Sequence, residues 1–259
     1  MDSTYREMAA VFLPAFRRLM KDRKSPQAEY SVFYTRSTGK VELFCTLFAG
    51  NPRSAVVVAH PAIVGSCHAQ VLGLAHELSS AFSVILFDFR GHGRSGGRCP
   101  LGFSAVSEDL EVVVDRTRLM GFERIGVAGM SLGAAAAFLL ASRRRCFDSL
   151  VSIGCPPRFP ELGPAAGLPL LSRASLRALG MRVDPSPDGG PEPADVAPVL
   201  PPIPKLLIFG EWEVAPADDI AAFAESVPGP KRVMTIPGVW HADLGGREAM
   251  VREWFEETL

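Results

Sequence analysis

The five cysteines of this sequence lack the spacing of a metal site or of a disulfide framework. An odd number of cysteines without a C-x-x-C pair is typical of free thiols in a reducing compartment. The sequence therefore predicts no metal site and no stabilising disulfide, and it favours a cytoplasmic protein. The five positions are Cys45, Cys67, Cys99, Cys146 and Cys155.

An excess of charge of either sign is also missing. The formal net charge is −1 at pH 7, and the isoelectric point is near 6.5. Proteins that bind nucleic acid usually carry a basic patch or stripe, so we expect no nucleic-acid partner. The run Arg143 to Arg145 ends a helical pattern, where positive side chains interact favourably with the helix dipole.

No apolar run is long enough to cross a bilayer. The least polar segment, 125–141, contains glycines and is shorter than the roughly 20 residues that a membrane-spanning helix needs. Near the amino end, Arg6 and Glu7 precede a short apolar stretch that Pro14 interrupts, which does not match a secretory signal. We therefore expect a protein without a membrane span or a secretory leader.

The chain does contain enough apolar sequence for one full core. Hydrophobic residues make up 47% of its 259 residues, and α/β folds of this length often form one domain. We accordingly expect residues 1–259 to form a single domain. Residues 1–24 have the spacing of an amphipathic helix, which we expect to pack on that domain, with a homodimer contact or a lipid surface as alternatives.

Short apolar runs alternate with helical patterns from residue 54 onward. Continuous apolarity is typical of strands that helices cover on both faces. The alternation predicts an α/β fold with a doubly wound, mostly parallel sheet. The predicted strands are 54–59, 83–87, 124–128, 149–153, 205–209 and 232–236, preceded by strands at 30–36 and 41–49, and the predicted helices are 71–80, 104–119, 132–143, 217–226 and 247–258.

A proline-rich stretch interrupts this alternation. Twelve of the 22 prolines lie between Pro156 and Pro202, and only 170–179 has a helical pattern there. Insertions of this size are often lids or binding elements, so we predict a small lid over about 156–202. Its leucines favour a small-molecule substrate with an apolar group, although they could equally close the core over the sheet.

The segment Gly129–Gly133 follows an apolar strand pattern and precedes a helical one. In a G-x-S-x-G turn of this kind, a strained backbone lifts the serine hydroxyl clear of the sheet, and side chains at the glycine positions would collide with the turn. The alternative is a glycine-rich turn whose serine caps the helix. We interpret Ser131 as a nucleophile because the rest of the chain supplies partners for it.

A serine hydroxyl needs a positioned base, and the base needs an orienting acid. His241 follows the last predicted strand, at the sheet edge where catalytic groups of open α/β sheets gather. Glu213 follows the predicted strand 205–209. We predict His241 as the base and Glu213 as the acid. Other carboxylates remain competitors for the acid: Glu211, Asp218, Asp219 and Asp243.

An oxyanion hole needs two backbone N–H groups. One is expected from Leu132, directly after the nucleophile, and the other from the loop after strand 54–59. Since Pro61 has no N–H, Ala62 is the predicted donor and Ile63 the reserve. We expect His60 to brace this loop rather than to act as a base.

Together these motifs resemble the α/β-hydrolase family of serine hydrolases, from roughly residue 40 to the end. The resemblance is carried by the elbow 129–133, the His60-Pro61 loop, the stretch DFRGHGRS at 88–95, the acid loop and the final-loop histidine. Two features depart from the family pattern, because Pro61 stands where glycine is common and Glu213 where aspartate is usual. Pro216 also comes one residue early in the acid loop.

The resemblance implies an esterase or thioesterase that cleaves a small-molecule ester or thioester through an acyl-enzyme, without a cofactor or metal. It leaves several alternatives open. The same three side chains would serve an acyltransferase or a short-peptide hydrolase, and the fold also occurs in lyases and in cofactor-free peroxidases. A ligand-binding homologue with weak catalysis is a further alternative, since a fold does not determine a function.

Overall fold

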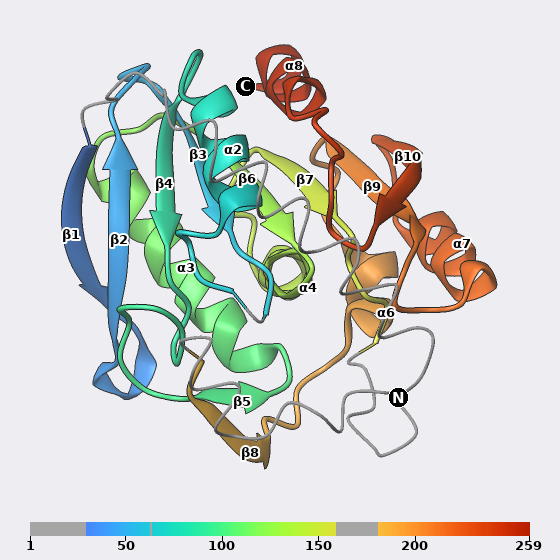
Figure 1. The fold of residues 1–259 in the computed structure, drawn as a ribbon, viewed down its shortest axis with the longest axis horizontal. Coiled ribbons are helices and arrows are strands. Elements are labelled where there is room, and N and C mark those ends of the chain that lie inside the picture. The colour runs from blue at the N-terminus through green and yellow to red at the C-terminus, as the bar shows by residue number, and fades with distance from the viewer. Residues whose placement is uncertain (1–29, 63, 159–180) are drawn as a thin grey trace.

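An eight-stranded, mostly parallel sheet forms the centre of the computed structural model, which describes residues 30–62, 64–158 and 181–259 (Figure 1). Its strand order is β1-β2-β4-β3-β6-β7-β9-β10. Only β2 pairs antiparallel, with β1 on one side and β4 on the other. The strands are β1 (Tyr30–Arg36), β2 (Glu42–Phe48), β3 (Ser54–Ala59), β4 (Ser83–Phe87), β6 (Arg124–Met130), β7 (Ser149–Ile153), β9 (Lys205–Trp212) and β10 (Lys231–Trp240).

Helices cover both faces of this sheet, which confirms the predicted doubly wound α/β fold. Helices α2 and α8 pack on one face, and α3, α4 and α7 pack on the other. Two short 3-10 helices, η1 (Thr38–Lys40) and η3 (Ala197–Val199), complete the helical elements described. The α-helices are α2 (Ala69–Leu78), α3 (Ser104–Leu119), α4 (Leu132–Arg143), α6 (Pro193–Val196), α7 (Ala217–Ser226) and α8 (Ala249–Thr258).

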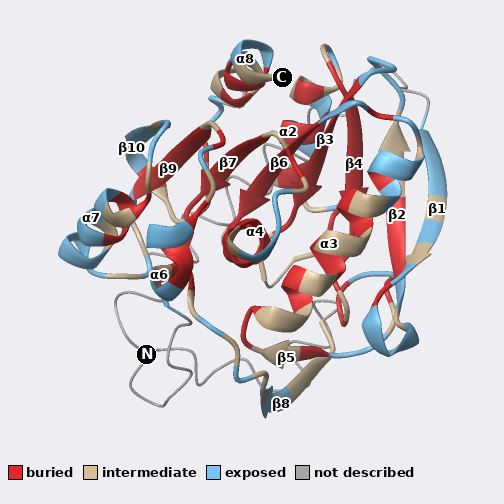
Figure 2. Cartoon of the chain, turned by 180° about the vertical axis from the view of Figure 1, so that it is seen from behind, coloured by how far each residue is buried: buried red, intermediate tan, exposed pale blue. Residues whose placement is uncertain are grey.

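The continuous apolarity of the central strands has the predicted cause. Along β3, Val57 packs into the cluster beneath α3 and α4, while its neighbours Val56 and Val58 pack into the cluster beneath α2 and α8. All residues of β3, β4 and β7 are buried, whereas the outer strands β1 and β10 are largely exposed (Figure 2). A strand buried on both faces has no position at which a polar side chain would reach water.

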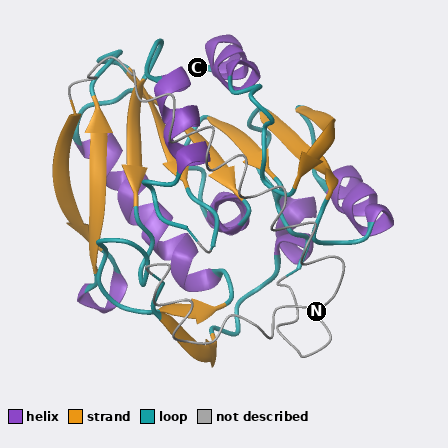
Figure 3. Ribbon diagram, viewed as in Figure 1, coloured by secondary structure: helices purple, strands orange, loops and turns teal. Residues whose placement is uncertain are grey.

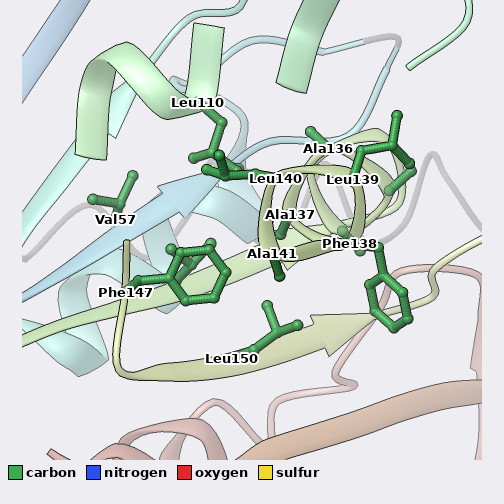
Figure 4. Packing of buried hydrophobic residues seen from close by; sticks show 14 of the residues in the cluster. Val57, Leu110, Ala136, Ala137, Phe138, Leu139, Leu140, Ala141, Phe147 and Leu150 are labelled. Atoms are coloured by element: carbon green, nitrogen blue, oxygen red, sulfur yellow. The ribbon is translucent and has the colours of Figure 1, made fainter. Parts of the chain in front are cut away.

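Helix α4 lies at the centre of the larger cluster (Figure 4). Its alanines at 134–137 are all fully buried, and they keep the helix close to the sheet. The larger Phe138, Leu139 and Leu140 fill the space toward neighbouring elements, with the ring of Phe138 at 5.2 Å from that of Phe223 in α7. This helix follows the elbow directly, so its burial holds the elbow in place.

Part of the predicted lid region differs from expectation. A second small sheet pairs β5 (Cys99–Leu101) with β8 (Val183–Pro187), apart from the main sheet in Figure 3, and neither strand was predicted. The prediction that only 170–179 is helical in this region is also wrong. Helix α6 forms because Pro193 occupies its first turn and Glu192 and Asp195 make a reciprocal capping box.

Three predicted features lie outside the described residues: the helix at 1–24, the residue Ile63 and the helical pattern at 170–179. Within the described ranges, no helix combines the length and the apolarity needed to cross a membrane.

Candidate active site

The elbow residue Ser131 lies between β6 and α4 in a strained conformation, with φ 50° and ψ −108°. Its backbone N–H donates to the carbonyl of Ile153 at 2.8 Å, which ties the turn to β7. A Cβ added at Gly129 would lie 2.5 Å from the carbonyl oxygen of Gly133. A Cβ at Gly133 would lie 2.2 Å from the carbonyl oxygen of Ala59. The two glycines are therefore required by backbone contacts on both sides of the serine.

Three predicted side chains meet at the carboxyl end of the sheet. Nε2 of His241 lies 2.7 Å from Oγ of Ser131. Its Nδ1 is hydrogen-bonded to Oε2 of Glu213, whose other oxygen accepts the N–H of Gly210 at 2.8 Å. The Glu213 side chain is 6% exposed and the His241 side chain 18%, so water competes little for the carboxylate. This chain of contacts can move a proton from Ser131 to the imidazole and stabilise the imidazolium.

The competing carboxylates have other partners. Glu211 accepts the backbone N–H of Gly238 at 2.7 Å, and Asp243 accepts the backbone N–H of Gly245 at 2.9 Å. The remaining two competitors, at 218 and 219, lie exposed in the first turn of α7. All of these carboxylates belong to the described residues, and among them Glu213 is the one bonded to the histidine.

One residue that shapes the site was missed in the sequence. Gly154 follows β7 with φ 60°, and a Cβ there would lie 2.6 Å from the backbone nitrogen of Ala242 and 3.1 Å from Nδ1 of His241. Ala242 itself has a φ of 57°, so the chain turns sharply after the histidine. The available signal was a glycine directly after an apolar strand. The reason for this glycine lies in a loop almost ninety residues away in the sequence, which only the fold brings beside it.

The predicted oxyanion donors lie in two different elements. Leu132 is the first residue of α4, and the first N–H groups of a helix have no acceptor within that helix. Ala62 lies half-buried in the turn after β3, and its carbonyl accepts a hydrogen bond from Nε2 of His92. Ile63 lies outside the described residues.

His60 is fully buried and makes the bracing contacts that were expected of it. Its Nε2 accepts the backbone N–H of Phe89 at 3.0 Å, and its Nδ1 lies 2.8 Å from the carbonyl oxygen of Pro61. Burial, followed by the neighbouring His92, lowers the pKa of His60 from 6.5 to about 3. The ring is therefore neutral at physiological pH, and both of its nitrogens are occupied by the backbone.

No group of three or more histidine, cysteine, aspartate or glutamate side chains is arranged to hold a metal ion in the part of the chain that the structure describes.

A serine on a strand-to-helix elbow, bonded to a histidine on the last loop of a mostly parallel sheet, defines an α/β protein with a nucleophile-elbow site. Comparison with known families agrees with that class. A family model described as "Alpha/beta hydrolase family" matches residues 56–259. The chain therefore belongs to the alpha/beta hydrolase family.

Curated relatives come from Mycobacterium tuberculosis. The chain is 29% identical over 208 residues to the uncharacterized protein Rv2307c of strain H37Rv and to the uncharacterized protein MT2364 of strain CDC 1551. Each match covers 74% of this chain and 66% of the relative, so the chain spans just under two thirds of the length of these proteins.

Solved structures with the same fold include several esterases. The esterase Pf2001 of Pyrococcus furiosus superposes with a TM-score of 0.75 at 18% identity, covering 93% of each chain. A thermophilic esterase from Thermogutta terrifontis gives 0.66 at 20% identity, covering 88% of this chain and 98% of that one. Est1E of Butyrivibrio proteoclasticus, solved with ferulic acid, gives 0.69 at 19% identity over 87% and 98%. At these identities the likeness establishes the fold alone.

Proposed function

We propose that this protein is a serine hydrolase that cleaves carboxylic esters or thioesters through an acyl-enzyme intermediate. The observation that carries the proposal is the continuous hydrogen-bonded chain from Ser131 through His241 to Glu213. The strained backbone at the serine supports it, because such strain is retained where a function requires it. The esterase relatives of the same fold add support for an ester substrate.

In the acylation half of the proposed reaction, Oγ of Ser131 attacks the carbonyl carbon while Nε2 of His241 accepts the hydroxyl proton. The carbonyl oxygen becomes an oxyanion, which the N–H groups of Leu132 and Ala62 stabilise. Glu213 holds the proton-bearing Nδ1 and stabilises the positive imidazolium. When the tetrahedral intermediate collapses, the imidazolium returns its proton to the departing alcohol or thiol, and the acyl group remains on the serine.

Deacylation repeats these steps with water in place of the serine. His241 takes a proton from the water as its oxygen attacks the acyl carbon, and the same two N–H groups stabilise the second oxyanion. The collapse of this intermediate returns the proton to Oγ and releases the carboxylic acid. Each residue ends in its starting state, so no cofactor or metal is needed to balance the cycle.

Covalent labelling with a fluorophosphonate and burst kinetics with p-nitrophenyl esters test the proposal. The wild-type protein should label once and release a burst of p-nitrophenol, while Ser131→Ala should do neither and should keep its melting temperature. Ser80→Ala is the matched control, because Ser80 lies exposed after α2 and its hydroxyl donates to the carbonyl of Glu77. Labelling of another serine in Ser131→Ala would show that the nucleophile is misassigned.

The same assays separate the alternatives that use the same side chains. Esters of increasing chain length, tested beside acyl-CoA thioesters, define the acyl group and the leaving group. An acyltransferase would form a new ester or amide when an alcohol or amine is added, at the expense of free acid. A ligand-binding homologue would bind the ester without a burst and without steady-state turnover, and this outcome would overturn the proposed function.

A further inference from the structure

Two histidines that the proposed mechanism does not use lie buried beside the loop after β3. His60 is 0% exposed and His92 is 1% exposed, and their ring centroids lie 4.9 Å apart in an edge-to-face arrangement. Burying an imidazole is costly unless its polar nitrogens are hydrogen-bonded. Each ring has a carbonyl partner in the same short segment, Pro61 and Ala62, which includes the proposed oxyanion donor.

The tautomer of His60 follows from its partners. The backbone N–H of Phe89 donates to Nε2 at 3.0 Å, so Nε2 must present its lone pair. A neutral ring then carries its proton on Nδ1, which donates to the carbonyl oxygen of Pro61 at 2.8 Å. The backbone of Phe89 thus determines which ring nitrogen holds the loop.

This bond acts on the peptide unit that contains the proposed oxyanion donor. The carbonyl of Pro61 and the N–H of Ala62 belong to the same planar trans peptide, in which they point in opposite directions. Fixing the carbonyl therefore fixes the direction of the N–H. The ring of Pro61 fixes its own φ, so this peptide can turn only about ψ of Pro61 and φ of Ala62.

His92 holds the carbonyl of Ala62, the residue whose N–H is the proposed oxyanion donor. Its Nε2 is in close hydrogen-bond contact with the carbonyl oxygen of Ala62, and its Nδ1 lies 3.1 Å from the carbonyl oxygen of Arg90. Burial, the largest influence, lowers the pKa of His92 and favours the neutral ring. The contact of Nε2 is the closer of the two, so we place the single proton there, with Ala62 as the acceptor.

A buried carboxylate joins the histidine-bearing loop to the oxyanion loop. Asp88 accepts the backbone N–H of Ser66 at 2.7 Å and that of Arg94 at 2.9 Å. A Cβ at Gly93 would lie 2.2 Å from one of the same carboxylate oxygens, so the loop around His92 fits closely over Asp88. These contacts with Asp88 fix the loop that carries His92, so the position of the ring relative to Ala62 is also fixed.

From these contacts we infer that His60 and His92 are positioning residues, which clamp the carbonyls of Pro61 and Ala62 and so aim the N–H of Ala62 at the oxyanion. The inference rests on the proposed function. Neither histidine touches the substrate or transfers a proton in this scheme. Loss of either contact should lower kcat more than it changes KM, because a misaimed N–H weakens binding of the tetrahedral intermediate more than binding of the ester itself.

The substitutions His92→Gln and His92→Asn form a matched pair for the test. The amide nitrogen of glutamine reaches the position of Nε2 and can still donate to Ala62, whereas that of asparagine ends near the position of Nδ1. We expect His92→Asn to lower kcat by roughly 10- to 100-fold with KM nearly unchanged, somewhat less than the loss of a whole oxyanion donor. His92→Gln should recover most of this loss, and His76→Asn on the exposed side of α2 should have no effect.

Affinity for a trifluoromethyl ketone provides the decisive second measurement. The tetrahedral adduct of this inhibitor carries an oxyanion, so His92→Asn should weaken its binding by the same factor as kcat, and His60→Gln should be tested in parallel. A loss of kcat without loss of inhibitor affinity, or equal behaviour of the glutamine and asparagine variants, would overturn the clamp. A wild-type protein that neither reacts with the fluorophosphonate nor turns over any ester would instead refute the proposed function.

Thermal melting separates folding from positioning in these variants. Both amides are polar and of similar size, so a general loss of fold should lower the melting temperature of both. If His92→Asn alone is unfolded, His60→Gln decides, because its amide reaches the position of Nε2 and can still accept from the N–H of Phe89, while the donor to Pro61 is lost. Wild-type kcat and inhibitor affinity in a folded His60→Gln variant would then also overturn the clamp.

Discussion

The substitution Glu213→Gln provides the sharpest test of the proposed acid, because it removes one charge while keeping the shape of the side chain. One oxygen of Glu213 accepts the N–H of Gly210 and the other accepts Nδ1–H of His241. Glutamine has a single oxygen for these two donors. If the oxygen stays on Gly210, the amide NH2 faces Nδ1 and stabilises the tautomer with its proton on Nε2. That proton points at Ser131, and the histidine can no longer accept one from it.

The expected magnitude follows from this change of tautomer. The corresponding acid-to-amide substitution in a serine protease lowers kcat about 10⁴-fold. At 1.36 kcal/mol for each factor of ten, this corresponds to about 5 kcal/mol of lost transition-state stabilisation. Stability should change far less, because the hydrogen bond to Gly210 is retained and one neutral hydrogen bond contributes about 1 kcal/mol. The loss should therefore lie in kcat, with the melting temperature close to that of the wild type.

The assay compares kcat for a p-nitrophenyl ester with the melting temperature of the same preparation. Glu211→Gln is the matched control, because the same chemical change is made two residues away on an exposed side chain that accepts the N–H of Gly238. It should leave kcat within a few-fold. A near-normal kcat in Glu213→Gln, with a collapse in Glu211→Gln, Asp218→Asn or Asp219→Asn, would refute the reasoning and move the acid along the loop.

Two further predictions concern stability. In urea titrations, Gly133→Ala should lower the free energy of unfolding by about 1–3 kcal/mol or more, because its Cβ would overlap the backbone of Ala59. The control Gly73→Ala in α2, where the nearest atom lies 4.0 Å from the added Cβ, should raise the free energy of unfolding slightly. Equal effects of the two substitutions would contradict this account of the elbow. The free energy of unfolding should also fall as the pH drops from 6.5 toward 3. In this range His60 binds a proton in the unfolded chain but stays neutral in the folded protein, where it is buried beside His92, His68 and Asp88. His60→Gln should flatten that pH dependence, and an unchanged slope would assign it to other groups.

The elements that could be predicted from the sequence are those whose local pattern and buried environment agree. β3, β4, β7, α3, α4 and α7 have the predicted bounds, because each is a continuous apolar run or a clear helical stripe. The small sheet could not be predicted in this way. β5 has only three residues, and β8 contains Pro185 and Pro187, which cannot donate hydrogen bonds. This pair depends on tertiary contacts, such as the bond from the N–H of Cys99 to the carbonyl of Arg182.

The residues of the candidate site also fall into two groups, those that the sequence predicts and those that depend on tertiary contacts. The sequence order and the strand ends suffice to propose Ser131 and His241, since catalytic groups gather at one edge of the sheet. The contributions of Gly154 and His92 come from contacts between loops that are far apart in the sequence. A glycine after a strand and a histidine in a loop are common, and nothing local distinguishes these two.

The length of β9 and β10 explains why the acid was difficult to select from the sequence. Both strands continue beyond their apolar runs to Trp212 and Trp240, which are register partners with ring centroids 5.4 Å apart. Glu213 and His241 follow these tryptophans directly, and the N–H of His241 donates to the carbonyl of Trp212 at 2.9 Å. The paired tryptophans, and not the spacing to Pro216, therefore determine which residue of the loop can act as the acid. A carboxylate one residue earlier or later would have its side chain on the other side of the strand end, since successive residues of an extended chain alternate in direction.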